Sequence, residues 1–170
     1  MKILVLNGSP RRTGNTACFV QAFKEGTESA GNTVDVKALS TMKFGACLAC
    51  GACRNGSGKC VQRDDLAPVI EALPGYDMVV FASPVYYWGF SGQMQAAVTR
   101  FYPYGPIPVG KFALILSSGS PNVYDGITAQ YKSMVRYFKG ESLGEFCFSG
   151  ADQKTEENIK AIRDFAAGLK

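Results

Sequence analysis

The segment that most constrains the fold is a short apolar run followed by a loop of small polar residues. Residues 2–6 read KILVL, residues 7–16 read NGSPRRTGNT, and a helical pattern begins directly after them. A strand that turns into a helix in this way leaves backbone N–H groups and the positive end of the helix dipole facing one point, where phosphate groups bind. The segment therefore predicts a phosphate site, with an ordinary helix start capped by Thr13 or Asn15 as the alternative.

The side chains of this loop suit a single phosphomonoester. Ser9, Asn15 and Thr16 offer hydrogen-bond donors, and Arg11 adds positive charge. The loop lacks the Gly-Lys-Ser/Thr ending of a P-loop and the G-x-G-x-x-G pattern of dinucleotide folds. A phosphomonoester is therefore a better interpretation than a triphosphate or a pyrophosphate.

The rest of the chain alternates strand and helix patterns. The central apolar runs are hydrophobic on both faces, which is typical of a parallel sheet covered by helices on two sides. We therefore expect a doubly wound α/β architecture, in which ligands bind beyond the carboxyl ends of the strands. The expected strands cover residues 2–6, 33–39, 77–82, 111–116 and 143–148.

Aromatic residues follow the expected strand at 77–82. Residues 83–92 read SPVYYWGFSG, and three of the aromatic side chains, Tyr86, Tyr87 and Trp88, are consecutive. Such side chains at a ligand-facing edge stack on a flat ring system, whereas the alternative is a lid or a subunit contact. A phosphate held by one loop and a planar ring held by the next describe FMN.

Four of the six cysteines lie close together. Cys47, Cys50, Cys53 and Cys60 form the pattern C-x2-C-x2-C-x6-C. Thiolates at this spacing can surround one [4Fe–4S] cluster, and a zinc site, a disulfide or free thiols are the competing interpretations. Because the chain has no histidine, histidine-ligated metals and histidine-based catalysis are excluded.

Composition sets the remaining bounds. With 170 residues, 46% of them apolar, we expect a single domain over residues 1–170, with residues 43–63 as a cysteine-rich insertion loop. The net charge of +4 is too small to indicate nucleic-acid binding. The apolar runs are strand-sized, so we expect no membrane span and a cytoplasmic protein. Cys18 and Cys147 are expected to be buried apolar residues.

The order of these motifs resembles the flavodoxin-like fold, and within it the NADPH-dependent FMN reductases and the iron–sulfur flavoproteins. The resemblance rests on GSPR-x-x-GNT after the first strand, on SPVY-x-W after the third, and on the cysteines. It covers residues 2–169. It implies a three-layer sandwich with a five-stranded parallel sheet in the order 2-1-3-4-5, and FMN at the ends of strands one, three and four.

The resemblance also implies which residues contact FMN. One group grips the phosphate, a second lines the isoalloxazine ring, and a third loop contacts the flavin, although it reads SSGSP where we would expect a glycine pair. The phosphate contacts are Ser9, Arg11, Asn15 and Thr16. The ring contacts are Pro84, Val85, Tyr86, Tyr87 and Trp88, and the contacts of the third loop are Ser118 and Gly119.

The function implied by the resemblance is an FMN-dependent oxidoreductase with an unknown acceptor. Electrons would come from NAD(P)H, or from reduced ferredoxin by way of a [4Fe–4S] cluster. The alternatives are a flavodoxin-like electron carrier without its own substrate and an FMN-binding protein with a structural cysteine-ligated metal. By analogy we expect a homodimer or tetramer. Four basic residues near the cysteines either dock an acidic carrier or only face solvent: Lys43, Arg54, Lys59 and Arg63.

Overall fold

In a computed structural model, which describes residues 1–56 and 58–170, five strands form one sheet in the order β2-β1-β3-β4-β5. Every pairing between neighbouring strands is parallel. This confirms the predicted flavodoxin-like architecture and strand order. The strands are β1 (Lys2–Asn7), β2 (Thr33–Ala38), β3 (Met78–Pro84), β4 (Lys111–Ser118) and β5 (Glu141–Ser149).

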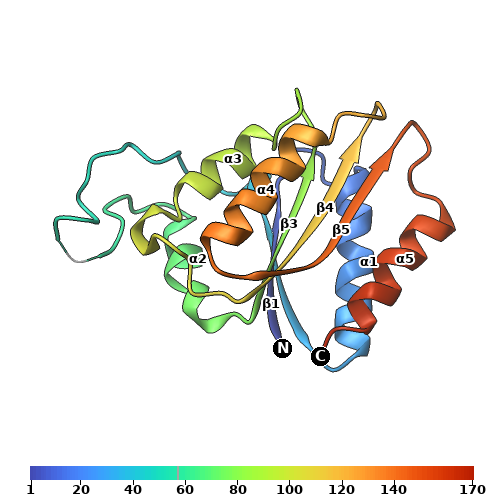
Figure 1. Ribbon diagram of the computed structural model, residues 1–170, viewed down its shortest axis with the longest axis horizontal. Coiled ribbons are helices and arrows are strands. Elements are labelled where there is room, and N and C mark those ends of the chain that lie inside the picture. The colour runs from blue at the N-terminus through green and yellow to red at the C-terminus, as the bar shows by residue number, and fades with distance from the viewer. Residues whose placement is uncertain (57) are drawn as a thin grey trace.

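Helices cover both faces of the sheet (Figure 1). One face packs against α1 (Asn15–Ser29) and α5 (Glu156–Ala167). The opposite face packs against α2 (Ala67–Glu71), α3 (Gly92–Thr99) and α4 (Asp125–Tyr137). Short 3-10 turns follow β2, α2 and α3, at Leu39–Thr41, Leu73–Gly75 and Tyr102–Tyr104. None of the helices in the described residues is long and apolar enough to cross a membrane.

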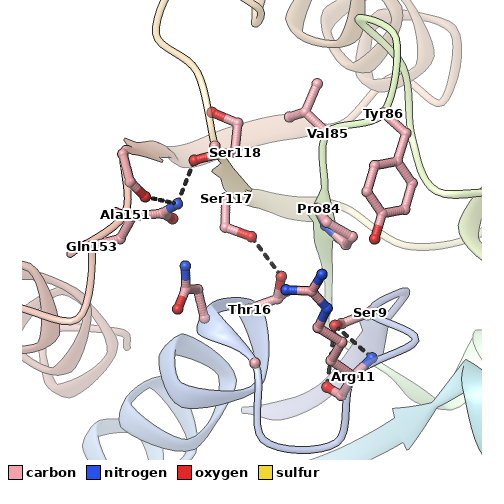
Figure 2. A pocket seen from close by; sticks show the side chains of 14 residues that line it. Ser9, Arg11, Thr16, Pro84, Val85, Tyr86, Ser117, Ser118, Ala151 and Gln153 are labelled. Atoms are coloured by element: carbon pink, nitrogen blue, oxygen red, sulfur yellow. Dashed lines mark hydrogen bonds between the residues drawn. The ribbon is translucent and has the colours of Figure 1, made fainter.

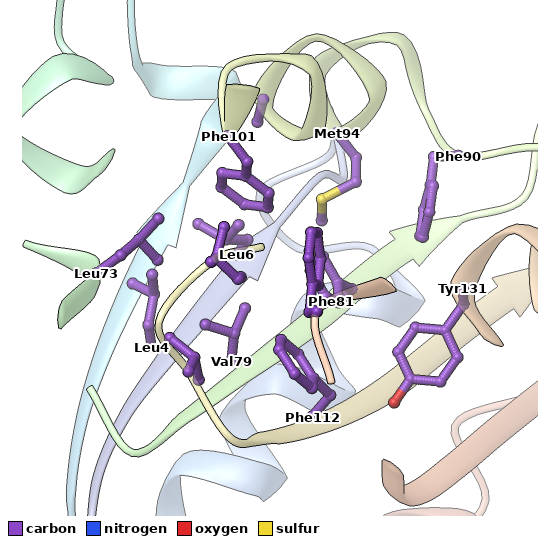
Figure 3. Close-up of a cluster of buried hydrophobic side chains, with 14 of the residues drawn as sticks. Leu4, Leu6, Leu73, Val79, Phe81, Phe90, Met94, Phe101, Phe112 and Tyr131 are labelled. Atoms are coloured by element: carbon purple, nitrogen blue, oxygen red, sulfur yellow. The ribbon is translucent and has the colours of Figure 1, made fainter. Parts of the chain in front are cut away.

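The apolar residues of β1 divide between the two cores because strand side chains point alternately to opposite faces. Ile3 and Val5 pack with the side chains of α1 and α5. Leu4 and Leu6 join the other core, in which Phe81 of β3 lies near the centre of an aromatic group (Figure 3). Both faces of β1 are therefore buried beyond Lys2, as expected for a strand in the interior of the sheet.

The register of the parallel strands brings their carboxyl ends to one edge. Asn7 at the end of β1 pairs with Ala82 of β3, and Pro84 at the end of β3 pairs with Ser117 of β4. The loops beyond the strands are then joined by backbone hydrogen bonds, with Gly8 N–H donating to Ala82 (2.8 Å) and Val85 N–H to Ser117 (2.8 Å). This edge is where ligands bind in such sheets.

The described residues of the cysteine segment (residues 43–63) lie between β2 and α2 and project from the side of the sheet that carries α3 (Figure 1). The described residues 43–56 and 58–63 form neither helix nor strand. The segment is held where it passes the end of α3, because the Cys47 N–H donates to Thr99 Oγ1 at 3.1 Å.

Strand β5 is an edge of the sheet and differs from the prediction. It starts earlier than expected, and its pairing with β4 shifts register between Phe112 and Ala113. Cys147 lies exposed on this strand, so the prediction that it is buried is wrong, whereas Cys18 on α1 is half-buried. At this edge position, fewer side chains of β5 are buried than in a central strand such as β4.

Candidate flavin site and cysteine site

A pocket of about 340 Å³ opens at the carboxyl ends of β1, β3, β4 and β5 (Figure 2). Nine of the eleven predicted FMN contacts line it, from Ser9 to Gly119. The full lining is Ser9, Arg11, Gly14, Asn15, Thr16, Pro84, Val85, Tyr86, Ser117, Ser118, Gly119, Gly150, Ala151 and Gln153.

Helix α1 begins at this pocket without a side-chain cap. Its N-cap is Gly14, in extended backbone conformation, and its first turn contains no acidic residue. The alternative of an ordinary start capped by Thr13 or Asn15 is therefore wrong. The first-turn N–H groups have no acceptor within the helix, so they and the helix dipole are available to an anion in the pocket.

The loop before α1 is shaped by its own short side chains. Asn7 Oδ1 accepts from the Ser9 N–H at 3.0 Å, and Ser9 Oγ accepts from the Arg11 N–H at 3.2 Å. Ser9 is buried, whereas Arg11 is exposed at the mouth of the pocket and extends its guanidinium along it (Figure 2). The loop is therefore folded before a ligand arrives, with one exposed cation at its edge.

Hydroxyl groups connect the two sides of the pocket. Thr16 Oγ1 of α1 lies 2.7 Å from Ser117 Oγ of β4, and both side chains are buried. On the other side, Ser118 Oγ lies 2.6 Å from the hydroxyl of Tyr124. That hydroxyl donates in turn to the carbonyl of Phe148 at 2.7 Å. The first contact joins the end of β4 to α1, and the other two join the ends of β4 and β5 through Tyr124.

The loop after β5 contributes part of the pocket that sequence reasoning missed. Gln153 is buried, and its Nε2 donates to the carbonyls of Ser118 and Gly150 (Figure 2). Its Oε1 is buried and has no hydrogen-bond partner among residues 1–56 and 58–170. No local motif marks these residues. The rule that ligands bind at the carboxyl ends of parallel strands would have pointed to the segment after β5.

A second pocket of about 280 Å³ adjoins the first and contains the two remaining predicted contacts, Tyr87 and Trp88. These residues form a tight turn in which Tyr86 and Gly89 exchange backbone hydrogen bonds of 3.1 Å. Tyr87 and Trp88 both adopt the left-handed region, with φ of 48° and 61°. This conformation costs about 1–2 kcal/mol per non-glycine residue and is frequent at functional sites.

The turn presents its aromatic rings to solvent instead of packing them in the core. Tyr87 is 96% exposed and Trp88 is 55% exposed. The pocket lining beside them is neutral, combining these rings with Val85, Val123 and the loop after β4. This arrangement suits an uncharged planar group better than a charged one.

The four clustered cysteines line one further pocket, together with Arg100 and the exposed side chains of Leu48, Val61 and Tyr102. All six cysteines of the chain are free thiols. Within residues 1–56 and 58–170, no three metal-ligating side chains are close enough together to hold an ion. The four predicted ligands thus share one site without forming a finished coordination sphere.

Two solved structures with a similar fold illustrate the likeness. An NAD(P)H:quinone oxidoreductase from Methanothermobacter marburgensis superposes with a TM-score of 0.77 at 19% identity, covering 100% of this chain and 96% of the other. A flavodoxin from the domain Archaea superposes with a TM-score of 0.64 at 14% identity, covering 98% and 94%. At these identities the likeness establishes the flavodoxin-like fold alone.

The family follows from the sequence match. Residues 1–154 match the model of the NADPH-dependent FMN reductases, and the chain belongs to that family. It is also 36% identical over 129 residues to an iron-sulfur flavoprotein of Archaeoglobus fulgidus, covering 75% of this chain and 56% of the relative. For an iron-sulfur flavoprotein of Methanocaldococcus jannaschii the identity is 29%, with coverages of 61% and 53%. The chain thus spans about half the length of these relatives.

Proposed function

We propose that this chain is an oxidoreductase that binds FMN across the two adjoining pockets and transfers electrons from NAD(P)H to an acceptor still to be identified. The observation that carries this proposal is the uncapped start of α1, which opens into a pocket lined by Arg11 and several hydroxyl groups. Membership of the FMN reductase family supports the same cofactor.

The residues present fit FMN chemically. Arg11, the first-turn N–H groups of α1 and the Thr16–Ser117 hydroxyl pair suit a phosphate ester with a polar chain attached. The unpartnered Oε1 of Gln153 is a buried acceptor for which a ligand hydroxyl or N–H would supply the missing donor. We propose that Ser9, Arg11, Asn15 and Thr16 hold the phosphate end.

The aromatic turn suits the planar end. We propose that Pro84, Val85, Tyr86, Tyr87 and Trp88 position the ring, with Ser118 and Gly119 on its other side. Bound FMN would supply hydride acceptance and electron transfer, so the protein itself needs no acid or base. The neutral, open lining beside Tyr87 and Trp88 leaves room for a flat donor such as a nicotinamide ring.

Comparing FMN with riboflavin tests the phosphate site directly. Charge-assisted hydrogen bonds to the phosphate should make apoprotein bind FMN about 100-fold more tightly than riboflavin, measured by flavin fluorescence quenching. Arg11→Ala combined with Asn15→Ala should reduce that ratio about tenfold or more. Arg12→Ala is the matched control, because Arg12 is the adjacent exposed arginine and does not line the pocket. Equal affinities for the two flavins in the wild type would contradict the proposal.

We further propose that the four cysteines hold a [4Fe–4S] cluster. The donor set of four thiols around one pocket is the observation that favours this, and the 36% identity to an iron-sulfur flavoprotein over 129 residues supports it. Exposed Lys43, Arg54 and Arg63 lie within the segment and suit an acidic electron carrier such as ferredoxin as a second donor. Anaerobic mixing with NADPH or with reduced ferredoxin, followed by flavin bleaching, distinguishes the donors.

We also propose a homo-oligomer, either a dimer or a tetramer. The exposed aromatic side chains of Tyr87, Trp88 and Tyr137 are the surface features that support it. Sedimentation equilibrium of the FMN-loaded protein measures the assembly, and a monomer at all concentrations would exclude it.

A further inference from the structure

The cysteine pocket contains a buried cation. Arg100 follows the last residue of α3 and is only 1% exposed, although it carries a permanent charge. An arginine is rarely buried to this extent unless its guanidinium is paired and hydrogen-bonded. Each contact that Arg100 makes therefore indicates what its burial achieves.

Most of these contacts go to the two ends of the cysteine segment. Arg100 Nη1 donates to the Gly45 carbonyl at 2.9 Å and to Asp64 Oδ2 at 2.6 Å, and Nη2 donates to Asp64 Oδ1 at 3.2 Å. Gly45 precedes the first clustered cysteine, and Asp64 directly follows the segment. One guanidinium thus brings together the beginning and the end of a stretch that otherwise lacks regular structure.

Arg100 also faces the cysteines themselves. It lines the pocket that all four clustered cysteines share, and Cys60 is among the groups that raise its pKa. The neighbouring Thr99 holds the backbone of Cys47. The end of α3 therefore contacts the first cysteine of the motif and lines a pocket with the last.

One donor of this cation has no partner. Arg100 Nε is fully buried and makes no hydrogen bond in the described part of the chain. A buried donor that lacks an acceptor is destabilising, and more so when the group is charged. An unpartnered Nε–H beside four thiols indicates that the pocket is completed by a negatively charged occupant.

We infer that Arg100 is a positioning residue for the cysteine site, which ties the two ends of the segment together and keeps a positive charge against the occupant that the thiolates hold. This inference rests on the proposed cluster. A nearby buried charge acts through a low dielectric and favours the state of the site with one more negative charge. Arg100 therefore raises the reduction potential of the site and slows the loss of iron.

Two substitutions in the same ion pair separate this role from a structural one. Arg100→Met removes the positive charge, whereas Asp64→Asn keeps the shape and removes the negative charge that opposes it. Both weaken the same salt bridge, so a structural role predicts changes in the same direction. A charge that acts on the cysteine site predicts a lower reduction potential for Arg100→Met and a higher one for Asp64→Asn.

The experiment uses the FMN-loaded protein, reconstituted anaerobically with ferrous iron and sulfide. The readouts are iron per chain, the half-life of iron against a chelator, and the midpoint potential of the cysteine site from an EPR-monitored redox titration. Arg100→Lys retains the charge and should keep the potential near that of the wild type. Arg54→Met is the matched control, because Arg54 also lies in the cysteine segment but is exposed. Its guanidinium carbon lies 4.5 Å from the centre of the Tyr102 ring. Its charge is screened by water, so the potential should not change.

The outcomes distinguish this inference from the proposed function. Iron loss several-fold faster in Arg100→Met, with potential shifts of opposite sign in the two variants, supports Arg100 as the positioning residue. Iron uptake in the wild type with equal or same-direction shifts overturns the inference and leaves the cluster standing. A wild type that takes up no iron overturns both. Flavin content reports folding in every sample.

A double variant covers the case in which Arg100→Met alone loses its flavin. Arg100→Met with Asp64→Leu removes both charges and leaves no buried ion without a partner, an exchange that is often neutral for stability. Faster iron loss in a folded double variant supports the inference, and unchanged iron retention overturns it.

Discussion

The proposed flavin site and the cysteine site are built in opposite ways. The flavin site lies where four parallel strands end, and its loops are fixed by short hydrogen bonds such as the one between Thr16 and Ser117. The cysteine site lies in a segment without helix or strand in its described residues, and contacts from Thr99 and Arg100 hold it. The sheet positions the first site, whereas side chains at one helix end position the second.

This difference indicates which of the two sites is formed before its ligand binds. Strand register fixes the flavin loops whether or not a ligand is present, because a shift would disturb the pairing of the central strands. The four thiols share a pocket but are not gathered around a point, so their final arrangement depends on what they bind. Substitutions should therefore affect the two sites independently, except where they touch α3.

The sharpest separation of the two sites comes from Cys50→Ser. This change should reduce the iron content after anaerobic reconstitution to about a tenth or less of the wild-type value, because a cluster needs its thiolate ligands. The FMN content should stay unchanged. Iron analysis and flavin absorbance measure both quantities on one sample. The control is Cys18→Ser on α1, outside the motif, which should retain iron. Equal iron in the two variants would remove the cluster from the proposed function.

A second test changes a glycine in each region. A Cβ at Gly8 would lie 2.7 Å from Ser91 Oγ and 2.8 Å from Met94 Cβ, so Gly8→Ala should destabilise the fold by about 1–3 kcal/mol. A Cβ at Gly45 would meet only Gln62 Oε1, at an ordinary 3.6 Å. Gly45→Ala should therefore change stability little. Urea denaturation compares the two, and similar losses would contradict the contrast in rigidity.

The smallest expected effect concerns the carboxyl group that anchors the cysteine segment. Burial raises the pKa of Asp64. The hydrogen bond and the charge of Arg100, together with backbone N–H groups, lower this pKa by more than burial raises it, so the net shift is downward. Because the folded pKa lies below the unfolded one, the stabilisation is present above about pH 3.9 and is lost as pH falls through the folded pKa.

Carbon-13 NMR of the Asp64 carboxyl group measures this titration directly. In Arg100→Met only burial and the backbone donors remain, so the pKa of Asp64 should move upward. A carboxyl group that titrates at the same pH in both proteins would show that the ion pair does not hold the segment.

The sequence was sufficient for the fold because its central strands are continuous apolar runs separated by helical patterns. Residues of β1, β3 and β4 are buried on both faces, which made their parallel pairing predictable. The edge strand β5 was predicted less well, since its side chains alternate between exposed and half-buried. Cys147 was assigned to the core on its residue type alone, although an edge position leaves it exposed.

The site was predictable where short motifs mark the strand ends. The segments around Ser9 and Tyr86 have distinctive composition, and the structure brings them together. Gln153 and Arg100 carry no such mark. Gln153 lines the pocket because the ends of the strands meet there. Arg100 reaches the cysteine site because it is buried beneath a segment that is distant in the sequence. Neither property is visible in local sequence, because both are created by contacts between residues far apart in the chain.

Helix α3 connects the two sites at its opposite ends. Its N-cap residue Ser91 donates to the Gly8 carbonyl at 2.6 Å beside the flavin loop, and Arg100 reaches the cysteines from the other end. Each residue added to or removed from a helix rotates everything beyond it by about 100°. The length of α3 is therefore fixed, so chains built on this plan can vary in the cysteine segment and in the loop after α3, but an insertion within the helix would turn one of its two ends away from its site.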